Sequence, residues 1–257
     1  MASKYQKLQN KHVLVIGGTS GLGFAVAEGS LASGAHVTVS SSNPSRVEST
    51  LQKLKSSFPE ATIAGHVCDL SKPTCEQDIE ALFAKVGKVD HIVYTAGDKL
   101  ATAPISEITY EKLIAAGQIR FFAALLVAKV GSKFLSPGPF SSITLTTGSI
   151  SQKPRPNWSM IAGYGSGLHA MTRNLAFDLK PIRVNLVSPG AVETELWDQV
   201  TSGDEKEKQA LFDAVAKSSP TGRLAQPEDV AEAYLFLMKD PNVTGTVVDS
   251  NSGALLV

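Results

Sequence analysis

A glycine cluster follows a short apolar run near the N-terminus. Val13–Ile16 leads into Gly17, Gly21 and Gly23, and an alanine-rich stretch comes next. A strand, a glycine turn and a helix start in this order can bind the phosphates of a dinucleotide. The helix start offers unpaired N–H groups and the positive end of its dipole. We expect the three glycines to let a pyrophosphate approach the backbone; a glycine turn without a ligand is the alternative.

The end of the second predicted strand distinguishes NAD from NADP. An NAD site usually places a carboxylate there, on the ribose 2′-hydroxyl. This sequence has Ser40, Ser41 and Ser42 instead, followed by Arg46. Hydroxyls and a guanidinium can hold a 2′-phosphate, so we predict NADP(H) as the cofactor. The alternative for Arg46 is a solvated position in the first turn of a helix.

Two further segments place small or acidic residues beside the predicted cofactor. Asp69 follows the third strand, where it would accept a hydrogen bond from the adenine amino group or cap the next helix. Thr95, Ala96 and Gly97 end the fourth strand with little bulk, as expected where backbone lies against a ribose. The five histidines show no metal-ligand spacing, so no metal site is predicted.

These residues need a scaffold of alternating strands and helices. Apolar runs predict strands over residues 13–16, 35–40, 62–67, 91–95, 142–147, 183–187 and 247–248. Helical patterns cover residues 24–33, 45–58, 72–86, 109–133 and 162–179. The alternation predicts an α/β fold, a Rossmann-type doubly wound parallel sheet in a single domain over 1–257, with the cofactor across the carboxyl ends of the strands.

Composition limits the classes of function. The 257 residues are 43% hydrophobic, which suffices for a core, and the net charge of +0 argues against nucleic acid or an anionic membrane as partner. Cys68 and Cys75 do not form a disulfide framework. Residues 1–11 lack the apolar core of a signal peptide, and the apolar run 121–130 is too short to span a bilayer. We expect a soluble, cytoplasmic protein that acts on a small molecule.

With these segments in place, the chain resembles the short-chain dehydrogenase/reductase family over essentially its whole length. The matching motifs are residues 17–23, 68–70, 94–97, 182–185, 188–194 and 222–231. The resemblance implies that Pro189–Thr194 closes over the nicotinamide, with Val192 on its carboxamide and Thr194 near the phosphates. It also implies a substrate lid at about 195–220, and a homodimer or homotetramer built through the two long helices.

The predicted cofactor-binding residues come from these motifs and from the ends of the strands. They are Gly17, Thr19, Ser20, Gly21, Leu22, Gly23, Ser40, Ser41, Ser42, Arg46, Asp69, Leu70, Ala96, Gly97, Thr146, Pro189, Gly190, Val192 and Thr194.

The family's catalytic residues do not carry over. Residues 172–179 match the family's Thr-x-x-Leu-Ala-x-Glu-Leu, and this register puts Ile161 at the tyrosine and Gly165 at the lysine. The serine position holds Gly148 and the asparagine position Gly117. A ketone that accepts hydride needs a proton or a strong donor on its oxygen, so we predict very slow ketone reduction.

Three interpretations remain for a chain that keeps the cofactor site without these groups. The electrophile is already cationic, such as an iminium; or the bound cofactor serves non-redox work, such as orienting a cyclisation; or the protein is a catalytically inactive sensor or scaffold.

The pattern resembles an atypical fungal branch of the family, which includes the reductase/Diels–Alderases of prenylated indole alkaloid biosynthesis. This resemblance implies that NADPH reduces a dienyl iminium, after which the pocket steers an intramolecular [4+2] cycloaddition of a hydrophobic, alkaloid-like intermediate. Arg120 and Trp158 match positions of that pocket. Arg155 departs from it, because an acidic residue is expected there and a guanidinium would repel a cationic substrate.

Arg120 interrupts an otherwise apolar helix on the side expected to face the cofactor. A buried arginine needs a partner, which is either the substrate or cofactor or a structural ion pair. Asp98 and Glu193 are the nearest anions, and each is expected as a cap or a lid contact.

Three other residues complete the predicted catalytic pocket. Trp158 would stack on an indole or simply anchor its loop. Arg155 is expected to be solvated or paired with the lid, with a role in the site as the alternative. Tyr164, one helical turn from Ile161, would reach the pocket or a subunit interface.

Overall fold

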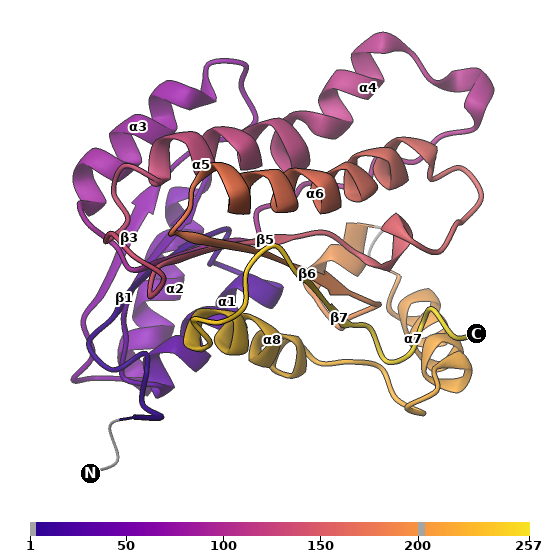
Figure 1. Cartoon of the computed structure of the whole chain (residues 1–257). Coiled ribbons are helices and arrows are strands. Elements are labelled where there is room, and N and C mark those ends of the chain that lie inside the picture. Colours follow the sequence, from indigo (N-terminus) through magenta and orange to yellow (C-terminus); the bar gives the residue numbers. More distant parts are fainter. Residues whose placement is uncertain (1–3, 200–203) are drawn as a thin grey trace.

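A single parallel sheet forms the centre of the computed structural model, which describes residues 4–199 and 204–257 (Figure 1). Over these residues the sheet has seven strands in the order β3-β2-β1-β4-β5-β6-β7. The strands are β1 His12–Ile16, β2 His36–Ser41, β3 Ile63–Val67, β4 His91–Tyr94, β5 Ser142–Thr146, β6 Arg183–Pro189 and β7 Val247–Ser250. The order reverses between β1 and β4, which opens a crevice at their carboxyl ends.

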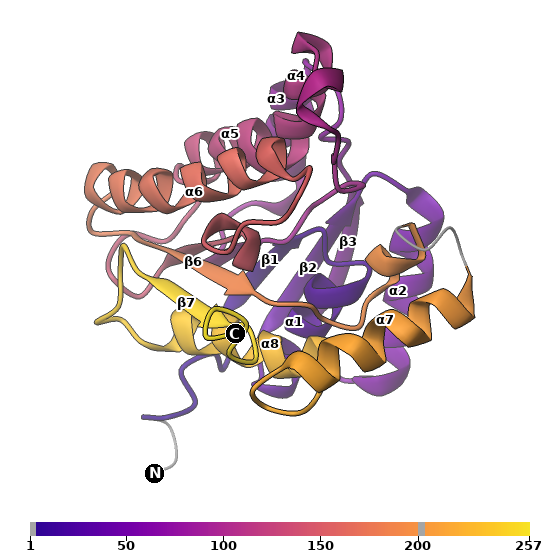
Figure 2. The same ribbon diagram turned by 90° about the vertical axis from the view of Figure 1, so that its right-hand side faces the viewer.

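Helices cover both faces of the sheet (Figures 1 and 2). One face carries α1 Gly21–Ala32, α2 Pro44–Ser57 and α8 Pro227–Lys239. The other carries α3 Cys75–Val86, α4 Tyr110–Gly117, the π-helical segment Gln118–Ala123, α5 Ala124–Gly131 and α6 Ser159–Asp178. Short 3₁₀ turns lie at Ile105–Glu107, Ser149–Ser151 and Glu195–Gln199, and α7 Glu205–Ser218 packs near the strand ends.

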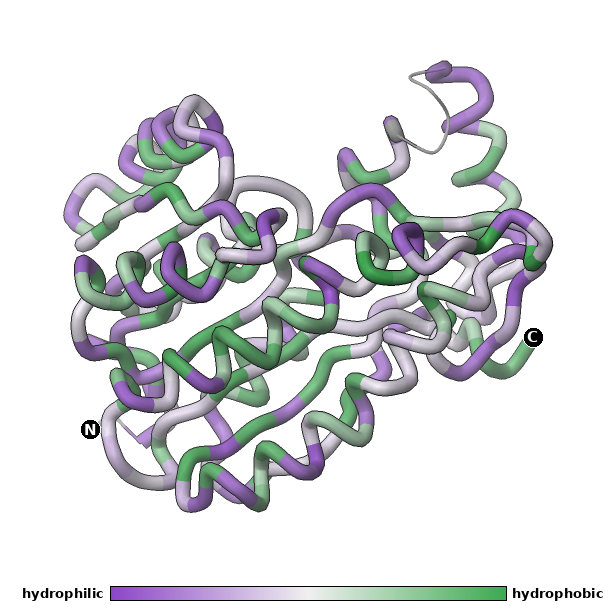
Figure 3. Tube along the Cα trace, turned by 90° about the horizontal axis from the view of Figure 1, so that it is seen from above, coloured by the Kyte–Doolittle hydropathy of each residue, from purple (hydrophilic) through white to green (hydrophobic). Residues whose placement is uncertain are grey.

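The central strands read as apolar runs because both of their faces are buried. Leu14 and Ile16 of β1 pack toward α3, α5 and α6, whereas Val13 and Val15 pack toward α1 and α8. Colouring by hydropathy shows apolar and polar residues alternating along the helices (Figure 3). The doubly wound α/β fold predicted from the sequence is confirmed.

The structure corrects the predicted helix boundaries. Helix α1 begins at Gly21 and not at residue 24, because the glycine turn itself leads into the first helical turn. Helix α3 begins at Cys75 rather than at residue 72. The π-helical segment interrupts the predicted helix 109–133. Helices α7 and α8 are absent from the helices predicted from the sequence.

The expectation that the apolar run 121–130 is too short to span a bilayer also needs correction. The helical segment Tyr110–Gly131, which joins α4, the π-helical segment and α5, is long and apolar enough to cross a membrane by length and composition alone. Ala123, Ala124, Val127 and Ala128 of this helix belong to the core between the sheet and α3, which is the place of a core helix in this fold.

Candidate functional site

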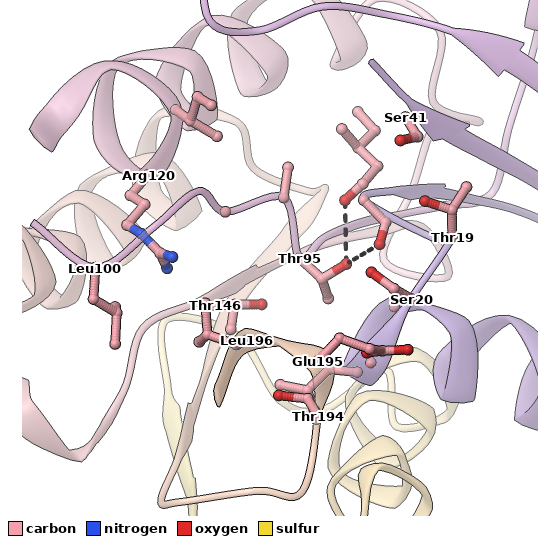
Figure 4. Close-up of a pocket in the computed structure, with 18 of the residues that line it drawn as sticks. Thr19, Ser20, Ser41, Thr95, Leu100, Arg120, Thr146, Thr194, Glu195 and Leu196 are labelled. Atoms are coloured by element: carbon pink, nitrogen blue, oxygen red, sulfur yellow. Dashed lines mark hydrogen bonds between the residues drawn. The ribbon is translucent and has the colours of Figure 1, made fainter. Parts of the chain in front are cut away.

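A cleft of about 1240 Å³ opens along the carboxyl ends of the strands (Figure 4). Every residue predicted for the cofactor or the substrate lines this one cleft, together with residues of the 3₁₀ turn at Glu195–Gln199. The sequence motifs lie far apart along the chain, so their convergence here follows from the strand order.

The three predicted glycines all line the cleft, but they differ in what surrounds them. Gly17 has φ +89° and donates its N–H to the Ser40 carbonyl over 2.9 Å. A Cβ at Gly17 would lie 2.5 Å from the Ala96 nitrogen, and one at Gly23 would lie 2.2 Å from the Gly17 carbonyl oxygen. A side chain at either position would collide with the protein's own backbone, so close packing gives a second reason for glycine there, beside the predicted approach of a pyrophosphate. Gly21, with φ +48°, faces Thr194 across the cleft.

The start of α1 supplies an anion-binding surface. Ser20 precedes the helix with an extended backbone, and its side chain makes no capping hydrogen bond. The first helical turn carries no acidic residue, and its N–H groups have no intrahelical acceptor. Thr19, Ser20 and Thr194 surround this point (Figure 4), so a phosphate there would meet N–H and hydroxyl donors.

The end of β2 presents hydroxyls and cations. Ser40 is buried, and its hydroxyl has no hydrogen-bond partner among the described residues. The Asn43 side chain caps α2 by accepting from the Arg46 N–H at 3.1 Å, which places Arg46 at the cleft. Lys53, two turns along the same helix, also lines it; its spacing of seven residues from Arg46 is the signal that would have identified it.

Asp69 stabilises a turn beside the cleft and does not cap a helix. Its Oδ1 accepts hydrogen bonds from the Ser71 N–H at 3.0 Å and the Ser71 hydroxyl at 2.7 Å, and Lys72 lies 3.3 Å from Oδ2. The Ser71 hydrogen bonds, ahead of the Lys72 charge, hold the pKa of Asp69 below its usual value. Because Thr74 precedes α3, the capping alternative is wrong.

Two threonines at the strand ends use their hydroxyls within the protein. Thr146 Oγ1 donates to the Tyr94 carbonyl at 2.6 Å and lies 2.7 Å from the Tyr234 hydroxyl. Thr95 Oγ1 lies within 3.3 Å of the Ile16 and Gly17 carbonyls (Figure 4). These hydrogen bonds tie β1, β4 and β5 together below the cleft.

Arg120 lies in the π-helical segment, with its guanidinium over Gly97. A Cβ at Gly97 would stand 2.8 Å from Nη1 of Arg120. Its Nε donates to Asp98 at 3.1 Å, and Nη2 donates to the Asp98 carbonyl. Asp98 is thus the ion-pair partner of Arg120, which corrects the expectation of a cap or lid contact. Burial lowers the pKa of Arg120, while Asp98 opposes that shift.

Arg155 and Trp158 form a pair on the loop after β5. The guanidinium lies over the indole, 5.5 Å from the ring centroid. Arg155 is exposed and has no ion-pair partner within residues 4–199 and 204–257, so the predicted pairing with the lid is not seen there. Trp158 is half-buried and precedes α6. Glu193, the other predicted anion, accepts a hydrogen bond from Gln226 at 2.8 Å.

Tyr164 lines the cleft but uses its hydroxyl elsewhere. The hydroxyl donates to the Leu113 carbonyl at 3.0 Å, and the ring fills the space that Gly117 leaves. Ile161, Gly148 and Gly165 also line the cleft. Among the described residues that line the cleft, Tyr164 is the one tyrosine and Lys53 the one lysine. Lys53 lies on α2, the helix that follows β2.

The lid predicted at about 195–220 contains the 3₁₀ turn Glu195–Gln199 and helix α7. Its residues 200–203 are not among those that the structure describes. Trp197 donates its indole N–H to the Val192 carbonyl at 2.7 Å and meets Phe212 of α7 edge-on. Both tryptophans of the chain thus line the cleft, Trp158 from the β5 loop and Trp197 from the lid.

Comparisons with known proteins agree with this geometry. A model of the SDR-like Rossmann domain matches residues 4–257. The short-chain dehydrogenase/reductase malC of Malbranchea aurantiaca is 44% identical over 97% of this chain and 96% of its own length. The solved MalC reductase/Diels-Alderase of that organism has a TM-score of 0.92 at 43% identity, covering 99% of this chain and 100% of the other.

Another similar protein has been solved with NADPH bound. The NADPH-bound short chain oxidoreductase of Pseudomonas aeruginosa PAO1, described as containing an atypical catalytic center, has a TM-score of 0.84 at 25% identity. The match covers 95% of this chain and 96% of that one.

Proposed function

The chain belongs to the short-chain dehydrogenase/reductase family, and we propose that it is an NADP(H)-dependent reductase of an imine or iminium. One observation carries the proposal. The cleft keeps its dinucleotide end, while Ile161 and Gly165 occupy its reaction end, where the family places a hydroxyl and an ammonium group.

The residues at the dinucleotide end fit NADP(H). The N-terminus of α1 with Thr19 and Ser20 would hold the pyrophosphate, and Ser41, Ser42 and Arg46 would hold the 2′-phosphate. The buried Ser40 hydroxyl, which has no partner among the described residues, is suited to a polar ligand at this point. The NADPH-bound relative from Pseudomonas aeruginosa supports the assignment. Thr194 would lie near the phosphates, and the other predicted residues, from Asp69 to Val192, would contact adenine, ribose and nicotinamide.

The reaction end favours an electrophile that needs no proton. When bound, NADPH supplies a hydride. A ketone would require a donor on its oxygen, but Ile161 and Gly165 offer none and the Tyr164 hydroxyl is engaged with Leu113. An iminium ion becomes a neutral amine when its carbon accepts hydride, so it avoids this requirement. An imine avoids it only when its nitrogen is already protonated. The charge of Arg120 is offset by Asp98 at 3.1 Å, which lowers its repulsion of a cationic substrate.

A second activity fits the same pocket. The similarity to the MalC reductase/Diels-Alderase supports an intramolecular [4+2] cycloaddition after reduction, in fungal indole alkaloid biosynthesis. Leu100, Ile119, Ile161, Leu168 and Trp158 give the substrate end an apolar lining that suits a hydrophobic, alkaloid-like intermediate. A bound cofactor without redox turnover is the alternative.

We also propose a cytoplasmic homodimer or homotetramer. The long helices expose Tyr110, Leu113, Ile114, Leu125 and Phe177, and an apolar surface of this kind is typical of a protein interface. Sedimentation equilibrium tests this part of the proposal, which a monomer at micromolar concentration would contradict.

Stopped-flow oxidation of NADPH tests the function. We expect NADPH to bind with a micromolar or lower Kd and to be oxidised by protonated 1-pyrrolinium ions and by N-alkyl dihydroisoquinolinium ions, but not by cyclohexanone or acetophenone. Rapid turnover of the ketones would overturn the proposal. Tight NADPH binding without oxidation by any iminium would establish the non-redox alternative.

A further inference from the structure

We propose that the substrate carries a carboxylate beside a planar ring, and that Arg155 and Trp158 recognise these two groups together. The inference rests on the proposed function and names the class of substrate for the same site. Its evidence is the geometry of the loop after β5, the way that loop is held, and the balance of charge at the substrate end.

Arg155 and Trp158 present complementary surfaces to the cleft. The guanidinium lies 5.5 Å from the centre of the indole ring, so the two planar groups are already held together. Both line the cleft, alongside the aromatic ring of Tyr164. A planar ring can stack on Trp158, and a carboxylate on that ring can accept two parallel hydrogen bonds from the guanidinium.

The loop that carries the pair is fixed at several points. Lys153 donates its N–H to the Ser149 carbonyl at 2.8 Å, and its ammonium donates to the Ala254 carbonyl at 2.9 Å. Asn157 has φ +67° and accepts the Ala103 N–H at 3.0 Å. Asparagine adopts this left-handed conformation more readily than most residues, and the hydrogen bond from Ala103 ties it to the segment before α4. The recognition surface is therefore formed before a ligand arrives, which lowers the entropic cost of binding.

The charges at the substrate end leave one cation without a counterion. Arg120 is paired with Asp98 at 3.1 Å, whereas Arg155 has no such partner among the described residues. The lid contributes two carboxylates, and neither pairs with Arg155 among the described residues. Asp198 lies 2.6 Å from Lys208, and Glu195 lies against Gly21 at the phosphate end, with Oε2 3.6 Å from the place of its Cβ. A substrate carboxylate would supply the missing negative charge.

Binding of three matched indoles to the NADPH-loaded protein tests the proposal. The probes are indole-3-acetate, the neutral indole-3-acetamide and the cationic tryptamine, and calorimetry measures the affinity of each. We expect the acetate to bind about tenfold more tightly than the amide, as one charge-assisted hydrogen bond would give, and tryptamine to bind most weakly.

Two substitutions separate charge recognition from general packing. Arg155→Gln should remove the preference for acetate over amide, and Arg155→Glu should make tryptamine the best of the three probes. The matched control is Lys180→Glu, because Lys180 lies 4.3 Å over the Phe177 ring outside the cleft; it should leave the order unchanged. An Arg155→Glu protein that binds NADPH normally and keeps the native order would overturn the inference. Failure of NADPH to bind the native protein would instead count against the proposed function.

Discussion

The hydroxyl of Tyr94, buried at the end of β4, donates a hydrogen bond to the backbone carbonyl of Ile119, one residue before Arg120. Ile119 belongs to the π-helical segment Gln118–Ala123, in which the change from i+4 to i+5 bonding leaves carbonyls without their usual partners. Burial raises the pKa of Tyr94, so the hydroxyl remains a donor. This contact stabilises the irregular turn that carries Arg120 at the cleft.

Tyr94→Phe should therefore loosen the turn that holds Arg120. We expect a loss of about 1 kcal/mol in unfolding free energy and faster amide exchange over residues 118–123, with NADPH affinity unchanged. Hydrogen exchange by mass spectrometry and urea unfolding measure the two effects. Tyr234→Phe is the matched control, because this buried tyrosine bonds to Thr146 and should lower stability without altering exchange in that segment. Native exchange rates in the Tyr94→Phe protein would contradict the prediction.

Asp98→Asn should lower iminium reduction without affecting the cofactor. The change leaves the Arg120 charge without its counterion, so a cationic substrate meets net repulsion at the reaction end. We expect kcat/KM for an N-alkyl dihydroisoquinolinium to fall about tenfold, which corresponds to about 1.4 kcal/mol, and the Kd for NADPH to stay within twofold. Glu193→Gln, which removes a carboxylate bonded to Gln226, serves as control. An unchanged kcat/KM in Asp98→Asn would show that the pair has no influence on the substrate.

The sequence predicts most of the fold because its strands are short apolar runs buried on both faces. It predicts less where a contact joins distant segments. The hydrogen bond from Tyr94 to Ile119, like the ion pair of Arg120 with Asp98, depends on the fold bringing the end of β4 next to the π-helical segment. The π-helical segment has no simple periodic signal, and α7 is only weakly apolar, with Phe212 as its buried residue.

Arg46→Ala should weaken NADPH binding much more than NADH binding. Arg46, Ser41 and Ser42 all line the cleft after β2, where only NADPH would present a phosphate. We expect the Kd for NADPH to rise about tenfold and the Kd for NADH to change less than twofold, as measured by nicotinamide fluorescence. Lys53→Ala tests whether the second cation shares this role. Equal losses for the two cofactors would place Arg46 at another part of the ligand.

His91 should make the protein sensitive to mild acid. This histidine is buried in β4 with Nδ1 2.9 Å from the Ser142 hydroxyl, and burial, followed by the Arg183 charge, lowers its pKa to about 3. The unfolded chain, with a histidine pKa near 6.5, binds more protons, so stability is full above pH 6.5 and declines as the pH falls toward 3.

Lowering the pH from 7.5 to 4.5 should reduce the unfolding free energy by about 2 to 3 kcal/mol through His91 alone. Urea unfolding at several pH values over that interval measures the slope, and His91→Asn should flatten it even if its stability at pH 7.5 is lower. A variant that loses stability with acid as steeply as the native protein would show that other groups dominate.

The effect of a substitution at Gly117 on stability should depend on the side chain at position 164. A Cβ at Gly117 would lie 2.5 Å from Cζ of Tyr164, so Gly117→Ala must displace a ring that also contacts Phe121 and donates to the Leu113 carbonyl. Overpacking of this kind costs about 1 to 3 kcal/mol, although alanine is otherwise favoured over glycine in a helix. We expect Gly117→Ala to be destabilising in the native background and neutral or stabilising in a Tyr164→Leu background. Urea unfolding of the two single variants and the double variant closes this cycle. Additive effects would show that the ring does not occupy the space beside Gly117.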